Sequence, residues 1–395
     1  MKIAIFSDNF FPELSGIADS VIALAKALSD RGHEIHFFVP QYSVADYRKG
    51  NLLQQELDLG PRVEIHRLPS FSVPSPTGQA RLVLPFGSSL REMRKVKPDI
   101  IHTQLIFGVG LEALLAGKMT HTPVIGTNHT AITEFVRYVP IRFPWAKKLA
   151  LRYAVWYYNC CEFVTAPSES VFSEMVPNGF VRPHQALSNP IDTDLFTEKE
   201  TKAKEKEETI KKMKLSPNTI VYAGRLAAEK NIDTIIRALP AVRAKVPDVV
   251  LALAGHGAGA DQLRTLAKNL RVDQHVRFLG TLEKPLLAKL YRAGKVFAIA
   301  STSETQSLTL MQALACGLPA VGVNARALPE YITSQNGSIV EPGDAEGMAN
   351  ALLAILKNKR TQQRLSKGAR KSVEPYSIHR VADAWEELYR RYKKA

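Results

Sequence analysis

The sequence predicts an α/β protein with two Rossmann-like, doubly wound domains that face each other across a cleft. Two series of short apolar strands alternate with helices, one between residues 2 and 168 and another between residues 219 and 324. Such alternation is typical of parallel sheets covered by helices on both faces. A charged stretch at residues 197–214 separates the series, and a chain of 395 residues is long enough for two or three domains.

The first domain is expected to span residues 1–196, and it opens with a βαβ unit. Its strands read KIAIFSD, HEIHFFVP, VEIHRLP, PDIIHTQ, PVIGTNH and FVTAPS. The second domain, residues 197–374, continues with TIVYAGRL, a helix at residues 232–245, DVVLALAG, VRFLG, VFAIAST and PAVGVN. In residues 375–395, Trp385 and Tyr389 have helical spacing, so we expect a helix that docks back on the first domain.

Charge and composition limit the partners and the compartment. The net charge of +14 favours anionic partners. The sequence has no zinc-finger spacing and no RNA-reading signature, so nucleic acid is not expected. Three cysteines, two of them adjacent, suggest no disulfide framework and fit a reducing compartment. Asp8 and Glu13 come too early for a secretory signal, and no apolar run approaches the ~18–20 residues of a spanning helix.

Two glycine-containing turns follow predicted strands. Gly16 closes the turn FPELSG, where a glycine lets backbone N–H groups approach an anion at a helix N-terminus; the alternative is a simple turn. Gly255 and Gly257 lie in GHGAGA, which matches the dinucleotide fingerprint with Ala260 as its last residue. This turn follows the second strand of its domain, and no acidic residue ends the next strand. A loop that faces a phosphate or a sugar is therefore favoured over NAD binding.

Two cations, Arg225 and Lys230, follow the strand TIVY within AGRLAAEK. At a strand end and early in a helix, both side chains can reach a diphosphate, the arginine as a bidentate donor and the lysine as a point charge. The alternative is the solvated start of a helix.

Residues 303–319, SETQSLTLMQALACGLP, combine a loop with an apolar helix that ends at Cys316-Gly317. Glu304 in the loop and Gln312 on the helix are polar in an otherwise apolar setting. A carboxylate and an amide can each form hydrogen bonds with vicinal hydroxyl groups. The segment therefore predicts a site for a ribose or a sugar.

With these motifs in this order, the chain resembles glycosyltransferase family 4, the large retaining family of the GT-B type. The resemblance runs nearly end to end, from KIAIFSDNFFPELSGI through GTNHT, APSES, NPID, GRLAAEK and AGHGAGAD to SETQSLTLMQALACGLPAV. It implies transfer of a hexose from a UDP- or GDP-sugar to an acceptor, without a cofactor. The alternatives are a related epimerase or phosphorylase, and a nucleotide-sugar-binding protein with little turnover.

The resemblance assigns four catalytic residues. Glu304 matches the first of two family glutamates and would support the transition state at the transferred sugar. His129 matches a histidine near that sugar. Arg225 and Lys230 match the diphosphate clamp. Gln312 stands where the second glutamate usually holds the donor ribose, so charge-assisted hydrogen bonds are lost there.

By the same resemblance, two cations take the place of a divalent ion, so no metal ion is expected. The expected donor-binding residues are Gly16, Arg225, Lys230, Gly255, Gly257, Thr305, Gln306, Ser307, Leu308 and Gln312.

Residues 135–158, FVRYVPIRFPWAKKLALRYAVWYY, interleave cations with aromatic residues, and only the part after Pro144 is a credible helix. Such side chains suit the headgroup layer of an anionic membrane. The residues concerned are Arg137, Arg142, Lys147, Lys148, Arg152, Phe143, Trp145, Trp156, Tyr157 and Tyr158. The arrangement resembles lipid-glycosylating family members that act on diacylglycerol or phosphatidylinositol. We therefore expect a cytoplasmic protein, peripheral at the inner face of the cell membrane, with a lipid acceptor; the alternative is a core helix and a soluble sugar acceptor.

Overall fold

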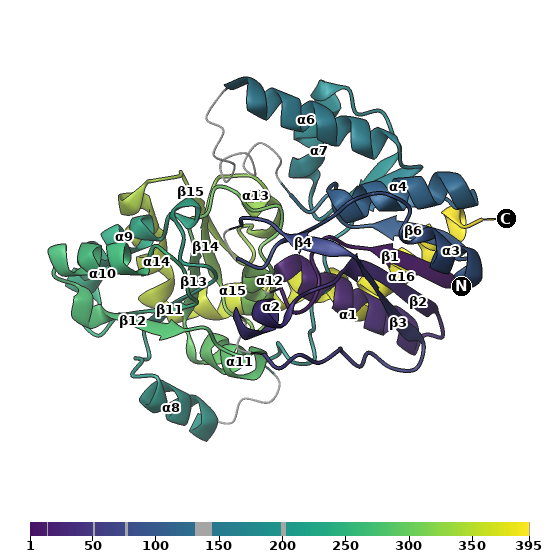
Figure 1. Ribbon diagram of the computed structural model, residues 1–395. Coiled ribbons are helices and arrows are strands. Elements are labelled where there is room, and N and C mark those ends of the chain that lie inside the picture. Colours follow the sequence, from purple (N-terminus) through teal and green to yellow (C-terminus); the bar gives the residue numbers. More distant parts are fainter. Residues whose placement is uncertain (14, 50–51, 76–77, 131–143, 199–202, 395) are drawn as a thin grey trace. The chain divides into compact units, whose positions relative to one another are not determined.

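The structure is a computed structural model that describes residues 1–395 except 14, 50–51, 76–77, 131–143, 199–202 and 395 (Figure 1). It divides into two compact units, one of residues 1–190 with 378–395 and the other of residues 191–377. The divisions fall after Pro190 and Ser377, whereas the sequence placed them after residues 196 and 374. Each unit contains one parallel sheet flanked by helices, which confirms the predicted Rossmann-like α/β fold.

The first unit has a seven-stranded sheet in the order β3-β2-β1-β6-β7-β8-β9, in which all neighbouring strands are parallel. The sequence did not predict β9 or the small antiparallel pair β4 and β5. The strands are β1 (Lys2–Phe6), β2 (Glu34–Pro40), β3 (Val63–Leu68), β4 (Ser70–Ser72), β5 (Arg81–Val83), β6 (Ile100–Thr103), β7 (Val124–Thr127), β8 (Phe163–Ala166) and β9 (His184–Ala186).

Helices cover both faces of this sheet, because successive side chains of each strand point to opposite faces and both sets are apolar. Ile3 and Ile5 pack with α1 (Gly16–Asp30) and α16 (Ile378–Tyr392). Ala4 and Phe6 belong to the core of the other face. The helices that contribute to this second core are α3 (Leu90–Val96), α4 (Gly108–Thr120), α6 (Pro144–Asn159) and α7 (Glu169–Met175). A short helix, α2 (Val44–Lys49), follows β2.

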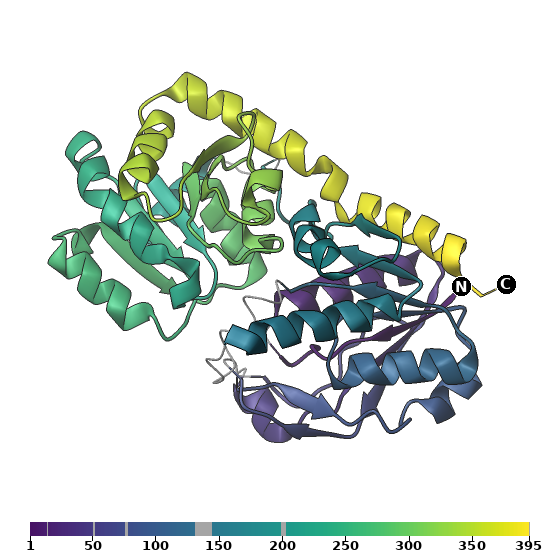
Figure 2. The ribbon, with the colours of Figure 1, turned by 90° about the horizontal axis from the view of Figure 1, so that it is seen from above.

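The C-terminal helix α16 belongs to the first unit, and Figure 2 shows it in yellow along that unit. Trp385 and Tyr389 are almost fully buried in the core that α16 shares with α1. Within the described part of the chain, no helix combines the length and the apolar character that crossing a membrane requires.

The second unit has a six-stranded sheet in the order β12-β11-β10-β13-β14-β15. The order reverses between β10 and β13, and in such sheets ligands bind at this switch point, outside the carboxyl ends of the strands. The strands are β10 (Thr219–Ala223), β11 (Val250–Ala254), β12 (Val276–Gly280), β13 (Val296–Ile299), β14 (Ala320–Val323) and β15 (Gly337–Val340), the last of which was not predicted.

The helices of the second unit pack against one continuous apolar core. The helix predicted at residues 232–245 is present as α9 (Ile232–Lys245), and part of the charged stretch forms α8 (Ala203–Lys212). The other helices are α10 (Ala260–Asn269), α11 (Lys284–Ala293), α12 (Leu308–Ala315), α13 (Leu328–Tyr331), α14 (Ala345–Leu356) and α15 (Lys359–Val373).

Candidate active site

The switch point of the second unit brings together two residues that the sequence assigned to different roles. Lys230 ends a short 3-10 helix, η3 (Ala228–Lys230), after β10, and Glu304 lies in the loop after β13. Lys230 Nζ donates to Glu304 Oε1 over 2.7 Å, and only 19% and 12% of the two side chains are exposed. The expected diphosphate cation and the expected sugar-facing carboxylate are therefore direct partners.

Asn231 ties the two loops together. Its backbone is left-handed, with φ of 47°, a conformation that asparagine adopts more readily than most residues. Its Nδ2 atom lies 3.2 Å from the carbonyl oxygen of Ala300 and 3.3 Å from Thr302 Oγ1. These bonds hold η3 against the end of β13 and so position Lys230 beside Glu304.

Glu304 is ionised at neutral pH. Burial raises the pKa of its carboxyl group, but the Lys230 ammonium and a hydrogen bond from Ser301 outweigh burial and lower the pKa below its ordinary value. The pair is therefore an ammonium and a carboxylate, and it presents one charge of each sign at the switch point.

Arg225 lies in the loop directly after β10 and is held by a residue that the sequence analysis did not single out. Its Nη2 atom lies 2.7 Å from Glu229 Oε1, and 42% of the Arg225 side chain is exposed. Opposite charges four residues apart are a recognisable signal for such a pair. The hydroxyl group of Tyr222 also donates to the Arg225 carbonyl oxygen over 3.0 Å, which supports the loop from below.

Gly255 and Gly257 allow the loop after β11 to lie against the loop after β10. A Cβ atom at Gly255 would lie 1.9 Å from the Gly224 carbonyl oxygen, and one at Gly257 would lie 2.3 Å from that of Leu226. Leu226 N also donates to the His256 carbonyl oxygen over 3.0 Å. The packing of the two loops therefore already requires glycine at both positions, whether or not the loop also faces a ligand.

Thr305, Gln306, Ser307 and Leu308 form the entry into α12. Ser307 is the N-cap, and its Oγ accepts from Leu310 N over 3.3 Å. Gln306 and Ser307 are largely buried, at 8% and 5% exposure. The stretch therefore presents the amino end of a helix, where backbone N–H groups without intrahelical partners are available to an anion.

Gln312 carries a buried acceptor on α12. Its Oε1 atom has no hydrogen-bond partner among the residues that the structure describes. An unsatisfied buried acceptor costs about 1–3 kcal/mol. This oxygen is suited to accept a hydrogen bond from a ligand hydroxyl group, as the sequence comparison with the family glutamate suggested.

In the first unit, His129 follows β7 and is part of a buried hydrogen-bond chain. His129 Nε2 lies 2.7 Å from Gln104 Oε1, Gln104 Nε2 lies 3.0 Å from His102 Nε2, and His102 Nδ1 lies 2.7 Å from the Tyr389 hydroxyl group. Burial lowers the pKa of His129 to about 4, so the ring is neutral at neutral pH and its Nε2–H donates to Gln104. The sequence analysis did not predict these three partners, although polar residues at the end of the apolar strand PDIIHTQ were a signal.

Gly16 is the first residue of α1, also in the first unit, and it is exposed. Ser15 caps the helix, because its Oγ accepts from Ile17 N over 3.2 Å. Gly16 therefore lies at a capped helix N-terminus that follows β1, as predicted.

Helix α6 has a cationic and aromatic outer face, which we define as Trp145, Lys148, Leu149, Arg152 and Trp156. All five are exposed, and Trp145, Leu149 and Trp156 are 59%, 57% and 52% exposed. The helix begins at Pro144, as expected, and residues 135, 137, 142 and 143 lie outside the described part of the chain.

Two of the aromatic residues expected at the headgroup layer face the other way. Tyr157 and Tyr158 are 0% and 1% exposed, and both belong to the core beneath α6. The prediction was wrong for these two, because a helix that covers a sheet must turn one side chain in three or four toward the core.

Comparison with known proteins agrees with this geometry. Residues 14–195 match the family described as Glycosyltransferase Family 4, and residues 203–372 match Glycosyl transferases group 1. Alpha-monoglucosyldiacylglycerol synthase of Acholeplasma laidlawii is 26% identical over 98% of this chain and 96% of its own length. The enzyme of that name from Streptococcus pneumoniae is 27% identical over 90% of this chain and 78% of its own length.

The fold agrees as well. The structure of Anabaena Alr3699/HepE in complex with UDP aligns with a TM-score of 0.78 and 18% identity over 99% of this chain and 100% of that one. Fold and family matches together define a glycosyltransferase of the GT-B type. The chain therefore carries a Glycosyltransferase Family 4 domain followed by a Glycosyl transferases group 1 domain.

Proposed function

We propose that this glycosyltransferase moves a hexose from a UDP- or GDP-sugar to a membrane lipid or lipid-linked acceptor, with retention of the anomeric configuration. The observation that carries the proposal is the pair of Lys230 and Glu304 at the switch point. A glycosyl transfer develops negative charge on the leaving diphosphate and positive charge on the sugar ring. The pair supplies one fixed charge of the opposite sign for each.

The leaving diphosphate is neutralised by Arg225 and Lys230, and no metal ion is needed for that. Arg225 is half-exposed, and Glu229 anchors its side chain without burying it. A guanidinium in this position can meet a diphosphate as a bidentate donor. Preorganised charges of this kind stabilise a transition state because they need little reorganisation during the reaction. In the second unit, the stretch 305–308 adds a helix N-terminus that favours an anion. In the first unit, Gly16 begins another such helix.

In the second unit, Glu304 holds the sugar and Gln312 holds the ribose. The ionised Glu304 offsets positive charge on the ring. The family resemblance gives His129, in the first unit, a role at the sugar. Its ring is neutral and is held by Gln104, so it adds no positive charge. The Gln312 Oε1 atom accepts from a ribose hydroxyl group.

The lipid acceptor is supported by the outer face of α6 and by the relatives. Exposed tryptophans beside cations suit the boundary of a membrane, where each well-placed Lys or Arg adds about 1 kcal/mol of attraction to anionic lipid. Two relatives that align with most of the chain are named alpha-monoglucosyldiacylglycerol synthase. We therefore place the protein at the cytoplasmic face of an anionic membrane.

A donor-by-acceptor screen tests the proposal. Purified protein is given UDP-glucose, UDP-galactose or GDP-mannose, with diacylglycerol in phosphatidylglycerol vesicles or with soluble sugars. We expect one donor to be used and an α-linked glycolipid to form, with the anomeric configuration read by NMR. Transfer to soluble sugars alone would reject the lipid acceptor in favour of a soluble sugar. A β-linked product would reject retention of the anomeric configuration. Donor binding without transfer would favour a nucleotide-sugar-binding protein.

A further inference from the structure

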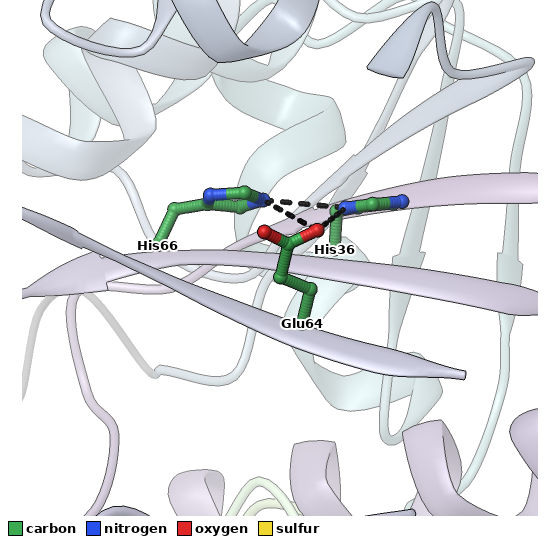
Figure 3. A group of neighbouring side chains, drawn as sticks. All are labelled: His36, Glu64 and His66. Atoms are coloured by element: carbon green, nitrogen blue, oxygen red, sulfur yellow. Dashed lines mark hydrogen bonds and ion pairs between the residues drawn. The ribbon is translucent and has the colours of Figure 1, made fainter. Parts of the chain in front are cut away.

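Three potential metal ligands lie side by side on two strands of the first sheet. Figure 3 shows His36 on β2 with Glu64 and His66 on β3, the edge strand. In the parallel register His36 is opposite Glu64, and Glu64 and His66 share a face because they are two residues apart. None of these residues has a role in the glycosyl transfer described above.

The three ligand atoms already have the spacing of a metal site. His36 Nδ1 lies 3.2 Å from His66 Nε2 and 3.3 Å from Glu64 Oε2, and His66 Nε2 lies 3.8 Å from Glu64 Oε2. Zinc bonds of ~2.0–2.2 Å in a tetrahedron place ligand atoms roughly 3.3–3.6 Å apart. An ion therefore fits between the three atoms with shifts of only a few tenths of an ångström.

The Glu34 carboxylate orients the buried His36 through the ring nitrogen that does not face Glu64 and His66. His36 Nε2 lies 2.9 Å from Glu34 Oε1, and Glu34 in turn pairs with Lys2 over 3.4 Å. In metal sites the second ring nitrogen of a ligating histidine usually donates to such a carboxylate, which fixes the tautomer. With its proton on Nε2, the His36 ring directs the lone pair of Nδ1 toward Glu64 and His66.

Packing also orients the ring of His66. The ring stacks on Phe38, with ring centres 4.7 Å apart. Its Nε2 atom lies toward His36 and Glu64. Glu64 is 63% exposed, which gives an ion a path from solvent to the site.

We propose that His36 Nδ1, His66 Nε2 and Glu64 Oε2 bind one divalent transition-metal ion, zinc in preference, with water in the fourth position. Two imidazoles and one carboxylate are a ligand set that zinc accepts readily. The ion would cross-link the edge strand β3 to β2 and so stabilise the first unit. The alternative is that no metal binds and that His36 Nδ1 and His66 Nε2 form a hydrogen bond with each other.

Zinc titration of the full chain tests the site. Protein freed of metal with a chelator is titrated with zinc chloride against a chromophoric competitor, and its melting temperature is measured with and without zinc. The variants are Glu64→Gln and His66→Gln, and the control is His121→Asn, an exposed histidine in a left-handed conformation that asparagine tolerates. Melting in excess chelator checks that each variant folds.

We expect one tight zinc ion in the wild type and the control, and affinity at least ~10-fold lower in both ligand variants. Zinc should raise the melting temperature of the wild type and the control more than that of the variants. Equal zinc affinity in the wild type and Glu64→Gln, whose side chain is mostly exposed, would overturn the site. Because the readout is metal binding, the result is independent of the proposed glycosyl transfer.

Discussion

Lys230 Nζ lies 2.7 Å from Glu304 Oε1, and this contact spans 74 positions of the chain to join the two loops of the switch point. The pair keeps the carboxylate ionised despite burial. It also means that Lys230 has two tasks in our proposal, because it must hold Glu304 and approach the diphosphate. The two cations of the clamp should therefore respond differently to substitution.

Replacing Arg225 with Ala should lower turnover by about 10²–10³-fold, because an electrostatic transition-state contact is lost. Stability should change little, since the side chain is 42% exposed. Steady-state kinetics and urea unfolding measure the two effects. The matched control is Arg237→Ala, which removes an arginine of α9 that pairs with Asp233 over 3.5 Å. Near-normal turnover in Arg225→Ala would remove Arg225 from the clamp.

Replacing Lys230 with Met should cost both activity and stability. Glu304 would then be a largely buried carboxylate without its partner. We expect the free energy of unfolding to fall by roughly 2–3 kcal/mol, a smaller loss than breaking a fully buried ion pair causes. Adding Glu304→Gln should restore most of that stability, because no unpaired charge remains, while activity stays low. A double variant no more stable than Lys230→Met would contradict the ion-pair account.

Replacing Gln312 with Glu should tighten nucleoside diphosphate binding or leave it nearly unchanged. The Oε1 atom has no partner among the described residues, and a carboxylate there can accept a charge-assisted bond from a ribose hydroxyl group. Calorimetry with UDP and GDP measures the affinity, and Gln312→Ala, which should weaken binding, is the comparison. A severe loss of affinity in Gln312→Glu would show that the amide NH₂ group makes the contact.

Stability should depend on pH through His129. Its pKa is about 4 in the folded protein against 6.5 ordinarily, so between these values the unfolded chain binds more protons and the free energy of unfolding falls as the pH falls. From pH 7 to pH 5 the expected loss is about 2 kcal/mol. Buried His102 acts in the same direction, whereas Asp8, whose pKa burial raises to about 6, acts in the opposite one.

The His129 contribution is therefore measured as a difference. Urea unfolding at pH 7 and pH 5 is compared between the wild type and His129→Gln, whose amide nitrogen can still donate to Gln104. The wild type should lose about 2 kcal/mol more than the variant. An equal loss would mean that His129 titrates normally and is not buried as a neutral ring.

Neutralising two cations on the outer face of α6 should weaken membrane binding. In Lys148→Gln with Arg152→Gln, the affinity for anionic vesicles should fall by about 2 kcal/mol, or roughly 30-fold, at low salt. Lys367→Gln with Lys371→Gln is the matched control, since it removes the same charge at the same spacing from exposed positions of α15. Co-sedimentation measures binding. Equal loss in both double variants would indicate a net-charge effect rather than a binding face.

Much of the fold was predictable because local patterns specify it. Short apolar strands alternating with helices predicted two parallel sheets, and the helix expected at residues 232–245 has those bounds in the structure. Short elements with weak patterns were missed, among them β9 (His184–Ala186) and β15 (Gly337–Val340). Neither is a fully buried apolar run, since β9 reads HQA and β15 reads GSIV. Their pairing with a neighbouring strand is what makes them strands.

The sequence by itself determined which residue types stand at the strand ends, and from them we predicted that Arg225, Lys230 and Glu304 share one ligand site. Only the tertiary structure decided how they pair, since Lys230 contacts Glu304 while Arg225 contacts Glu229. The same holds for the two histidines and the glutamate shared by β2 and β3, which no motif relates. Chemistry and spacing are local properties of a chain, whereas a contact between distant residues exists only after strand order and register bring their side chains together.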